Sequence, residues 1–271
     1  MDLQLQGKRA LVTGSSKGIG EAIARKLAQE GALVVVHGRD AAQAGAVADD
    51  IVRQGGRAHV VLGDLTREAE VERLIDDARR LAGSIDIVVN NAGGSGGAKE
   101  TWAETRPDSW ASAYDRNVLA AVRVTTRLLP GMQRSRWGRV INISSLAAIM
   151  PPATAPDYSA CKAAMNTMTV SMAKAVAAHG ITVNAVSPGT IHSASLDRRF
   201  REVAVERGVA GRDAPWEEVE RAVLPMFAQV PVGRVGSLEE IANAVAFLAS
   251  PLASYITGVN LRIDGGLSPG L

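Results

Sequence analysis

Short apolar, β-branched runs alternate along the chain with longer segments whose apolar residues recur every three or four positions. The first apolar run covers residues 9–13, and the second covers residues 33–36. Between them, residues 23–28 carry apolar side chains at helical spacing. Short β-branched runs predict strands, whereas three-four spacing predicts an amphipathic helix. The chain is therefore expected to begin as a strand, a covering helix and a second strand.

The same alternation continues to the end of the sequence. Further strands are predicted at residues 58–62, 85–89, 139–143, 182–186 and 259–263, with a helical segment before each of them. The run at 85–89 is almost continuously apolar, which is typical of a parallel strand buried on both faces. This order predicts a three-layer, doubly wound α/β fold with about seven parallel strands. No linker or repeat divides residues 1–271, so one domain is expected.

The stretch at residues 190–235 breaks this rhythm. Its helical pieces, including one at residues 215–228, are followed by no strand of their own. We interpret the stretch as an insertion after the carboxyl end of a strand, where it would cover the ligand crevice as a lid. An additional pair of packing helices is the alternative interpretation.

Residues 13–20 read TGSSKGIG, directly after the first predicted strand and before the first predicted helix. Gly14, Gly18 and Gly20 leave room for a tight turn and for the close approach of a pyrophosphate. The helix that follows offers unpaired N–H groups and the positive end of its dipole to that anion. Glycine-rich turns are common elsewhere, but the strand-turn-helix context indicates a Rossmann-type dinucleotide site.

The second strand ends in the sequence VVVHGRD, which bears on the choice of cofactor. An acidic residue at this place would accept hydrogen bonds from a ribose 2′-hydroxyl and repel a 2′-phosphate. Gly38 stands there instead, followed by Arg39, whose guanidinium suits a phosphate, and Lys17 adds a second positive charge. The alternative is that Arg39 is a solvated turn residue and Asp40 only caps the next helix. We predict NADP(H) rather than NAD(H).

Tyr158 and Lys162 are four residues apart and share one face of a predicted helix, whose buried stripe is expected at Met165, Met168, Met172 and Val176. A phenol titrates near pH 10, and a nearby ammonium favours the phenolate and lowers its pKa. The pair therefore predicts a general acid/base that protonates a carbonyl oxygen or deprotonates an alcohol.

Several motifs together resemble the single-domain branch of the short-chain dehydrogenase/reductase family, over essentially the whole chain. TGSSKGIG is similar to that family's TGxxxGxG, NNAG at residues 90–93 to its fourth-strand motif, and YSACK to its YxxxK. INISS ends at Ser145, thirteen residues before Tyr158 (158 − 145 = 13), which is the family's spacing for its active-site serine and favours Ser145 over Ser144. RNVLA contains Asn117 at the place of the family's asparagine, and SPG at 187–189 resembles its nicotinamide loop.

The resemblance implies roles for four catalytic residues. Tyr158 would transfer the proton, and Ser145 would hold the carbonyl oxygen. Lys162 would bind the ribose hydroxyls and lower the tyrosine pKa, while Asn117 would hold a water that links the lysine to solvent.

The resemblance and the glycine loop also imply a cofactor site. In the family, the residue that matches Asp64 meets the adenine, residues 91–93 line the adenosine ribose, and the backbone of residues 188–191 touches the carboxamide. Capping of a loop by Asp64 and a simple strand-end turn at 90–93 are the alternatives. The expected cofactor-binding residues are Gly14, Ser16, Lys17, Gly18, Ile19, Gly20, Arg39, Asp64, Leu65, Asn91, Ala92, Gly93, Tyr158, Lys162, Pro188, Gly189 and Ile191.

Composition and charge exclude several other classes. The chain is 46% hydrophobic and 21% charged, with a net charge of +2, so neither nucleic acid nor a membrane is expected as a partner. A single cysteine, Cys161, allows no internal disulfide, and no secretory signal opens the sequence, so a cytoplasmic protein is expected. His37, His59, His179 and His192 lack the spacing of metal ligands, and no metal is predicted.

The expected function is NADP(H)-dependent interconversion of a carbonyl and a secondary alcohol in a small molecule. An NAD-dependent alcohol or sugar dehydrogenase is the first alternative, and a non-catalytic dinucleotide sensor is the second. The general resemblance is to 3-oxoacyl-carrier-protein reductases and related ketoreductases. It implies a homotetramer, with residues 108–129 and 158–178 at one interface and residues 233–250 with the last strand at another.

Overall fold

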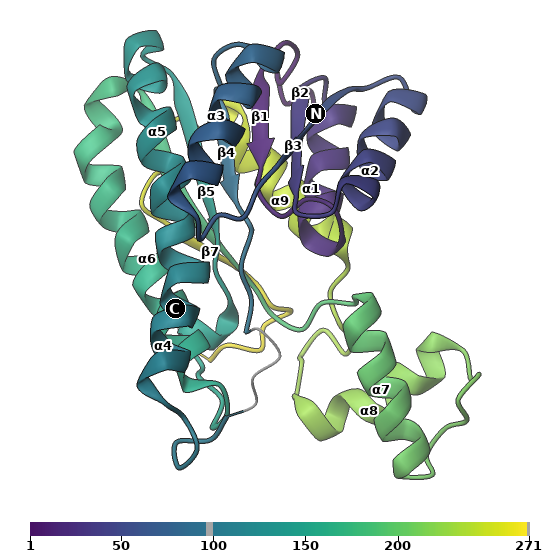
Figure 1. Ribbon diagram of the computed structural model, residues 1–271. Coiled ribbons are helices and arrows are strands. Elements are labelled where there is room, and N and C mark those ends of the chain that lie inside the picture. The colour runs from purple at the N-terminus through teal and green to yellow at the C-terminus, as the bar shows by residue number, and fades with distance from the viewer. Residues whose placement is uncertain (96–99, 270–271) are drawn as a thin grey trace.

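The computed structural model describes residues 1–95 and 100–269 of the chain. Within them, seven parallel strands form one sheet in the order β3-β2-β1-β4-β5-β6-β7 (Figure 1). The strand order reverses between β1 and β4, where ligands bind in sheets of this kind. The predicted doubly wound Rossmann-type fold is confirmed. The strands are β1 (Arg9–Val12), β2 (Leu33–Gly38), β3 (Arg57–Leu62), β4 (Ile87–Asn90), β5 (Gly138–Ile143), β6 (Ile181–Pro188) and β7 (Asn260–Ile263).

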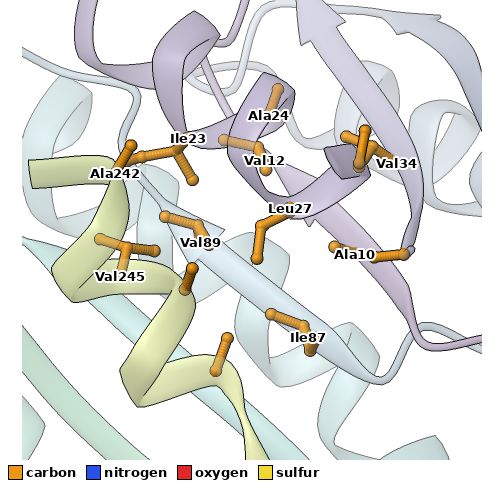
Figure 2. Packing of buried hydrophobic residues seen from close by; sticks show 14 of the residues in the cluster. Ala10, Val12, Ile23, Ala24, Leu27, Val34, Ile87, Val89, Ala242 and Val245 are labelled. Carbon is orange, nitrogen blue, oxygen red and sulfur yellow. The ribbon is translucent and has the colours of Figure 1, made fainter. Parts of the chain in front are cut away.

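Helices cover both faces of the sheet, because its strands are apolar on both sides. Val12 faces one layer and its neighbour Leu11 faces the other. Figure 2 shows the first layer, in which Ile23 and Leu27 of α1 and Val245 of α9 meet over the strands. The second layer comes from α3, α5 and α6. The α-helices are α1 (Gly18–Gln29), α2 (Ala41–Arg53), α3 (Glu68–Ala82), α4 (Pro107–Tyr114), α5 (Ala120–Ser135), α6 (Pro156–Val176), α7 (Ala194–Glu206), α8 (Trp216–Phe227) and α9 (Leu238–Ala249).

The buried face of α6 differs from the predicted one. Met168 and Met172 are only half-buried, whereas Thr169 and Ala173 are buried. The Thr169 hydroxyl accepts a hydrogen bond of 2.8 Å from the side-chain amide of Asn142 on β5, so this helix face must carry a polar group toward the sheet. Met165 and Val176 are buried as predicted. Hydrophobic spacing misplaced the two middle positions because it gave no weight to that polar partner.

The segment at residues 190–235 forms α7 and α8, which Figure 1 shows set apart from the layered body. The two helices pack on one another around their own apolar cluster, which includes Phe200 and Val223. The two ends of the segment are joined by backbone hydrogen bonds: Gly236 N donates to Thr190 O at 2.9 Å, and His192 N donates to Gly236 O at 2.8 Å. The segment therefore leaves the body and returns to it at a single closed base.

Candidate active site

The loop between β1 and α1 has the backbone of a phosphate cradle. Gly14 has φ +63°, and a Cβ there would lie 3.0 Å from the Cα of Ala92. A Cβ on Gly20, in the first turn of α1, would lie 2.3 Å from the carbonyl oxygen of Gly14. A side chain at either position would collide with neighbouring backbone, so these glycines let the loop fold closely against the helix N-terminus, where an anion gains most from the helix dipole. The observed loop thus fits the pyrophosphate of a dinucleotide.

The NNAG segment after β4 is tied to that loop. Asn91 donates from its side-chain amide to the carbonyl oxygens of Thr13 and Gly14 at 3.0 and 2.9 Å. The Thr13 hydroxyl accepts from the backbone N–H groups of Asn91 and Ala92, both at 3.0 Å. Residues 90–93 are therefore more than a strand-end turn, because they hold the glycine loop at the switch point of the sheet.

A cavity of about 450 Å³ opens beside this loop, which we call the first cavity. It extends from the glycine loop across the end of β2 to the loop after β3 and the segment after β4. Ten of its lining residues were singled out from the sequence: Gly14, Ser16, Lys17, Gly38, Arg39, Asp64, Leu65, Asn91, Ala92 and Gly93. The other six gave no signal as part of a cofactor site: His37, Gly63, Thr66, Ser112, Asp115 and Arg116.

The residues at the β2 end fit both interpretations made from the sequence. Asp40 caps α2 by accepting from Ala42 N and Gln43 N at 2.9 and 3.1 Å, as the alternative interpretation expected. Arg39 is exposed and lines the cavity, so its guanidinium is available to an anionic ligand there. The cavity carries positive charge at the place where a 2′-hydroxyl-binding acid would stand.

Asp64 serves two purposes at once. Its carboxylate accepts from the backbone N–H and the hydroxyl of Thr66 at 2.9 and 2.8 Å, and it also lines the first cavity. The backbone hydrogen bond from Thr66 lowers the pKa of Asp64, so the group is an acceptor at neutral pH. Capping of its loop and a place in the site are therefore compatible.

A second cavity of about 400 Å³ continues from the first, because Gly14, Lys17, Asn91 and Gly93 line both. It brings together residues from the glycine loop, β5, α6 and the end of β6. Its lining includes the predicted Ile19, Gly20, Ser145, Tyr158, Lys162, Pro188, Gly189 and Ile191, and also Gly94, Ile143, Ser144 and Ser193, which were not predicted. Of the expected cofactor residues only Gly18 lines neither cavity.

The two neighbouring serines after β5 have different partners. The Ser144 hydroxyl donates to the backbone oxygen of Lys162 at 3.2 Å and is buried. The Ser145 hydroxyl accepts from Ala147 N at 3.1 Å, and its interaction with Tyr158 lowers the pKa of that phenol. Ser144 thus fixes α6 against β5, whereas the Ser145 side chain lines the second cavity together with Tyr158.

Burial dominates the electrostatics of Tyr158 and Lys162. It raises the pKa of Tyr158 above 10, and the hydrogen bond with Ser145 opposes this rise. Burial lowers the pKa of Lys162 to about 8, and its ammonium donates to the carbonyl oxygen of Ile143 at 2.8 Å. The expectation that Lys162 lowers the tyrosine pKa is therefore wrong for the chain alone, because the ammonium lies 5.6 Å from the centre of the phenol ring and the desolvation of Tyr158 is larger.

Asn117 lies behind the wall of the second cavity and does not line it. Its side-chain amide donates to the carbonyl oxygens of Gly94 and Ala113 at 3.1 and 2.9 Å, and its oxygen accepts from Gly94 N at 2.8 Å. It belongs to one turn of π-helix, η1 (Asp115–Leu119), between α4 and α5. Such turns gather at functional sites, and no sequence signal predicted this one.

The other chemistry-bearing residues have structural partners. Cys161 is buried among apolar residues between α4 and α6, and burial raises the pKa of its thiol. His192 stacks on Trp216 at 3.9 Å between ring centres and approaches the Asp197 carboxylate at 3.2 Å. In the described part of the chain no three potential metal ligands gather, and no helix has both the length and the apolar character needed to cross a membrane.

Two joined cavities, a glycine cradle and a tyrosine with lysine and serine define a dinucleotide-dependent oxidoreductase. A family profile described as short chain dehydrogenase matches residues 8–204, and one described as enoyl-(acyl carrier protein) reductase matches residues 225–268. The chain belongs to the short-chain dehydrogenase/reductase family. It is similar to the 3-oxoacyl-(acyl-carrier-protein) reductases of Aquifex aeolicus, at 36% identity over 98% of this chain and 100% of the relative, and of Vibrio cholerae, at 38% over 98% and 99%.

Solved structures with the same fold carry either nicotinamide cofactor. The L-sorbose reductase of Gluconobacter frateurii, complexed with NADPH and L-sorbose, has a TM-score of 0.91 and 33% identity over the full length of both chains. A 7α-hydroxysteroid dehydrogenase complexed with NADH and 7-oxo glycochenodeoxycholic acid has a TM-score of 0.85 and 33% identity over 100% of this chain and 98% of the other. The fold is thus compatible with both cofactors, and the choice depends on the residues of each chain.

Proposed function

We propose that this chain is an NADP(H)-dependent reductase or dehydrogenase that interconverts a ketone and a secondary alcohol. The observation that carries the proposal is the second cavity, where Ser145, Tyr158 and Lys162 lie on one wall and the glycine loop on another. The 3-oxoacyl reductases and the sorbose reductase to which it is similar support a carbonyl as substrate.

The residues of the second cavity divide the proposed chemistry between them. The dinucleotide would supply or accept the hydride. Tyr158 donates its phenolic proton to the carbonyl oxygen, and the neutral phenol favoured by burial is the form that reduction needs. The Ser145 hydroxyl holds the same oxygen, and Lys162 supplies a positive charge 5.6 Å from the centre of the phenol ring.

A panel of carbonyl substrates tests the proposal. The purified chain is incubated with NADPH or NADH and with ketones, diketones, sugar ketoses and 3-oxoacyl thioesters, and oxidation of the cofactor is followed by absorbance. We expect turnover of at least one of these carbonyls with NADPH. Faster turnover with NADH would favour an NAD-dependent alcohol or sugar dehydrogenase, and dinucleotide binding without any turnover would favour a sensor.

Arg39 is proposed to select the 2′-phosphate. Replacing it with serine removes a charge-assisted hydrogen bond, so KM for NADPH should rise about tenfold to a hundredfold while KM for NADH changes little. Arg57→Ser is the matched control, since Arg57 is an exposed arginine that starts β3 and donates to Gly31 O outside the cavity. Equal KM values for NADPH in Arg39→Ser and wild type would contradict the assignment.

The segment at residues 190–235 is proposed to be a substrate lid on a single domain of residues 1–271. Its closed base at Thr190 and Gly236 and its separate apolar cluster support movement as a unit. Ile191 and Ser193 line the second cavity, so the base of the segment adjoins the site. Slower amide exchange in α7 and α8 when substrate binds would support the lid, and unchanged exchange would favour a pair of packing helices.

A homotetramer in the cytoplasm is proposed on similar grounds. Large apolar side chains are exposed on both predicted interfaces: Tyr114, Leu119 and Val170 on the first, and Leu252 and Val259 beside the second. Sedimentation of the purified chain should give four times its mass of 28.4 kDa, and a monomer would contradict the proposal.

The single cysteine is buried and unpaired, as suits a reducing compartment, and cell fractionation would test the proposed cytoplasmic location.

A further inference from the structure

His37 occupies an unusual place in the first cavity. It is the second-last residue of β2, only 3% exposed, and it lines the cavity between the glycine loop and the loop after β3. Its place in the sequence indicated no role, because the histidines lack the spacing of metal ligands. None of the mechanism described above uses its side chain.

Both ring nitrogens of His37 bind backbone groups of the cofactor loops. Nδ1 accepts from the backbone N–H of Gly14 at 3.0 Å, and Nε2 lies 3.0 Å from the carbonyl oxygen of Gly63. Because a backbone N–H can only donate, Nδ1 carries no hydrogen, and Nε2 donates to Gly63. The two partners thus fix a single neutral tautomer of the imidazole.

The backbone of His37 strengthens the same connection. Its N–H donates to the Ser15 hydroxyl at 2.9 Å, and its carbonyl oxygen accepts from Ser15 N at 2.8 Å. The glycine loop is therefore held to β2 at Gly14 and Ser15. The ring extends the link to Gly63, beside a backbone hydrogen bond of 3.2 Å from Gly63 N to the carbonyl oxygen of Gly38. Gly63 directly precedes Asp64 and Leu65, which line the opposite side of the first cavity.

We propose that His37 is a positioning residue of the cofactor site, whose neutral imidazole links the glycine loop to the loop after β3 as two walls of one cavity. The inference rests on the proposed cofactor, because both loops line the cavity assigned to its adenosine half. Protonation would place a second hydrogen on Nδ1, directly opposite the Gly14 N–H, and two donors facing one another repel. Dinucleotide affinity is thereby tied to pH through a residue that touches no reacting atom.

The surroundings of His37 keep the imidazole neutral near neutral pH. Burial lowers its pKa from the ordinary 6.5, and the positive charge of Arg39 adds to this effect. The hydrogen bond with Gly63 and the charge of Asp64 oppose it. Arg39 and Asp64 are the charged groups among the described residues that act on the ring, and Arg39 is also the proposed phosphate ligand. The link is consequently intact at pH 7 and breaks only in acid.

Three variants separate this proposal from a general loss of stability. His37→Phe keeps the ring shape and removes both hydrogen bonds. His37→Asn places an amide oxygen near the position of Nδ1, where it accepts from Gly14 at every pH. His59→Asn is the matched control, because His59 is half-buried on the neighbouring strand β3 and lines neither cavity.

The measurement is the Kd of NADP⁺ by calorimetry on each full-length protein, between pH 8 and pH 5. We expect His37→Phe to raise Kd about tenfold at pH 7.5, with kcat at saturating cofactor unchanged. The wild-type Kd should rise relative to that of His37→Asn below pH 6.5. The 2′-phosphate itself titrates near pH 6, but it does so for both proteins, so the ratio of the two Kd values isolates His37.

Two results would overturn the proposal. One is a ratio of Kd values for wild type and His37→Asn that stays constant with pH. This result would overturn the proposal even if His37→Phe fails to fold. The other is an equal loss of affinity in His59→Asn. Amide exchange at residues 13–18 and 63–66, measured without cofactor, should be faster in His37→Asn at residue 63 and its neighbours. This measurement tests the link even if NADP⁺ does not bind. Failure to bind NADP⁺ would count against the proposed cofactor and not against the link.

Discussion

Replacing Tyr158 with phenylalanine is expected to lower kcat for carbonyl reduction by about 10²- to 10⁴-fold, the range that a positioned general acid contributes. The Kd of the dinucleotide should stay within about twofold of wild type, because the ring remains in the cavity wall and only the hydroxyl is lost. Stopped-flow kinetics and calorimetry on the same preparation measure the two quantities. Burial raises the pKa of this phenol, so alcohol oxidation, which needs the phenolate, should keep accelerating as pH rises toward 10.

Tyr255→Phe is the matched control for this substitution. Tyr255 is fully exposed beyond α9 and lines neither cavity, so its hydroxyl should be dispensable. Wild-type kcat in Tyr158→Phe, or an equal loss in Tyr255→Phe, would refute the role of the Tyr158 phenol as proton donor.

The second large effect is expected for Lys162→Met, which should lose at least about 100-fold in kcat and become more stable relative to wild type at neutral pH. The ammonium is 3% exposed and burial lowers its pKa to about 8, so the unfolded chain binds this proton more tightly than the folded chain. Wild-type stability should therefore rise between pH 8 and pH 10, by an amount on the order of 3 kcal/mol, and this rise should be missing in the variant.

Urea unfolding of both proteins across this pH range measures the difference. Lys174→Met provides the control, since Lys174 lies exposed near the end of the same helix. A stability difference between wild type and Lys162→Met that does not change with pH would show that burial of the ammonium does not govern the titration of this group.

The sequence predicted the sheet and most of the cavity lining because those features depend on local rules. Alternating apolar runs define buried parallel strands, and a glycine loop between a strand and a helix has few other uses. The spacing between Ser145 and Tyr158 also favours Ser145 over Ser144, whose hydroxyl is bonded to the backbone of Lys162. These local signals can be read from the sequence alone.

Other features depend on contacts between distant segments and could not be read in this way. His37 acquires its two ring partners only when β2 is placed between β1 and β3, which brings Gly14 and Gly63 to opposite sides of the ring. The π-helical turn around Asn117 depends on its bonds with Gly94, more than twenty residues away in sequence. The balance of burial against charge at Tyr158 also requires the packed structure, since spacing gives proximity and no measure of desolvation.

The closed base at Thr190 and Gly236 also bears on how the substrate range of this fold can change. The chain enters and leaves α7 and α8 at hydrogen-bonded neighbours, and Val232 N donates to Gly265 O after β7 at 3.2 Å, so these contacts with the body lie near the two ends of the segment. The entropy of closing such a loop grows slowly with its length, so residues can be added to or removed from it at little cost to the folding of the body. Substrate recognition can thus diversify as an interchangeable module, while the nucleotide half of the molecule stays as it is.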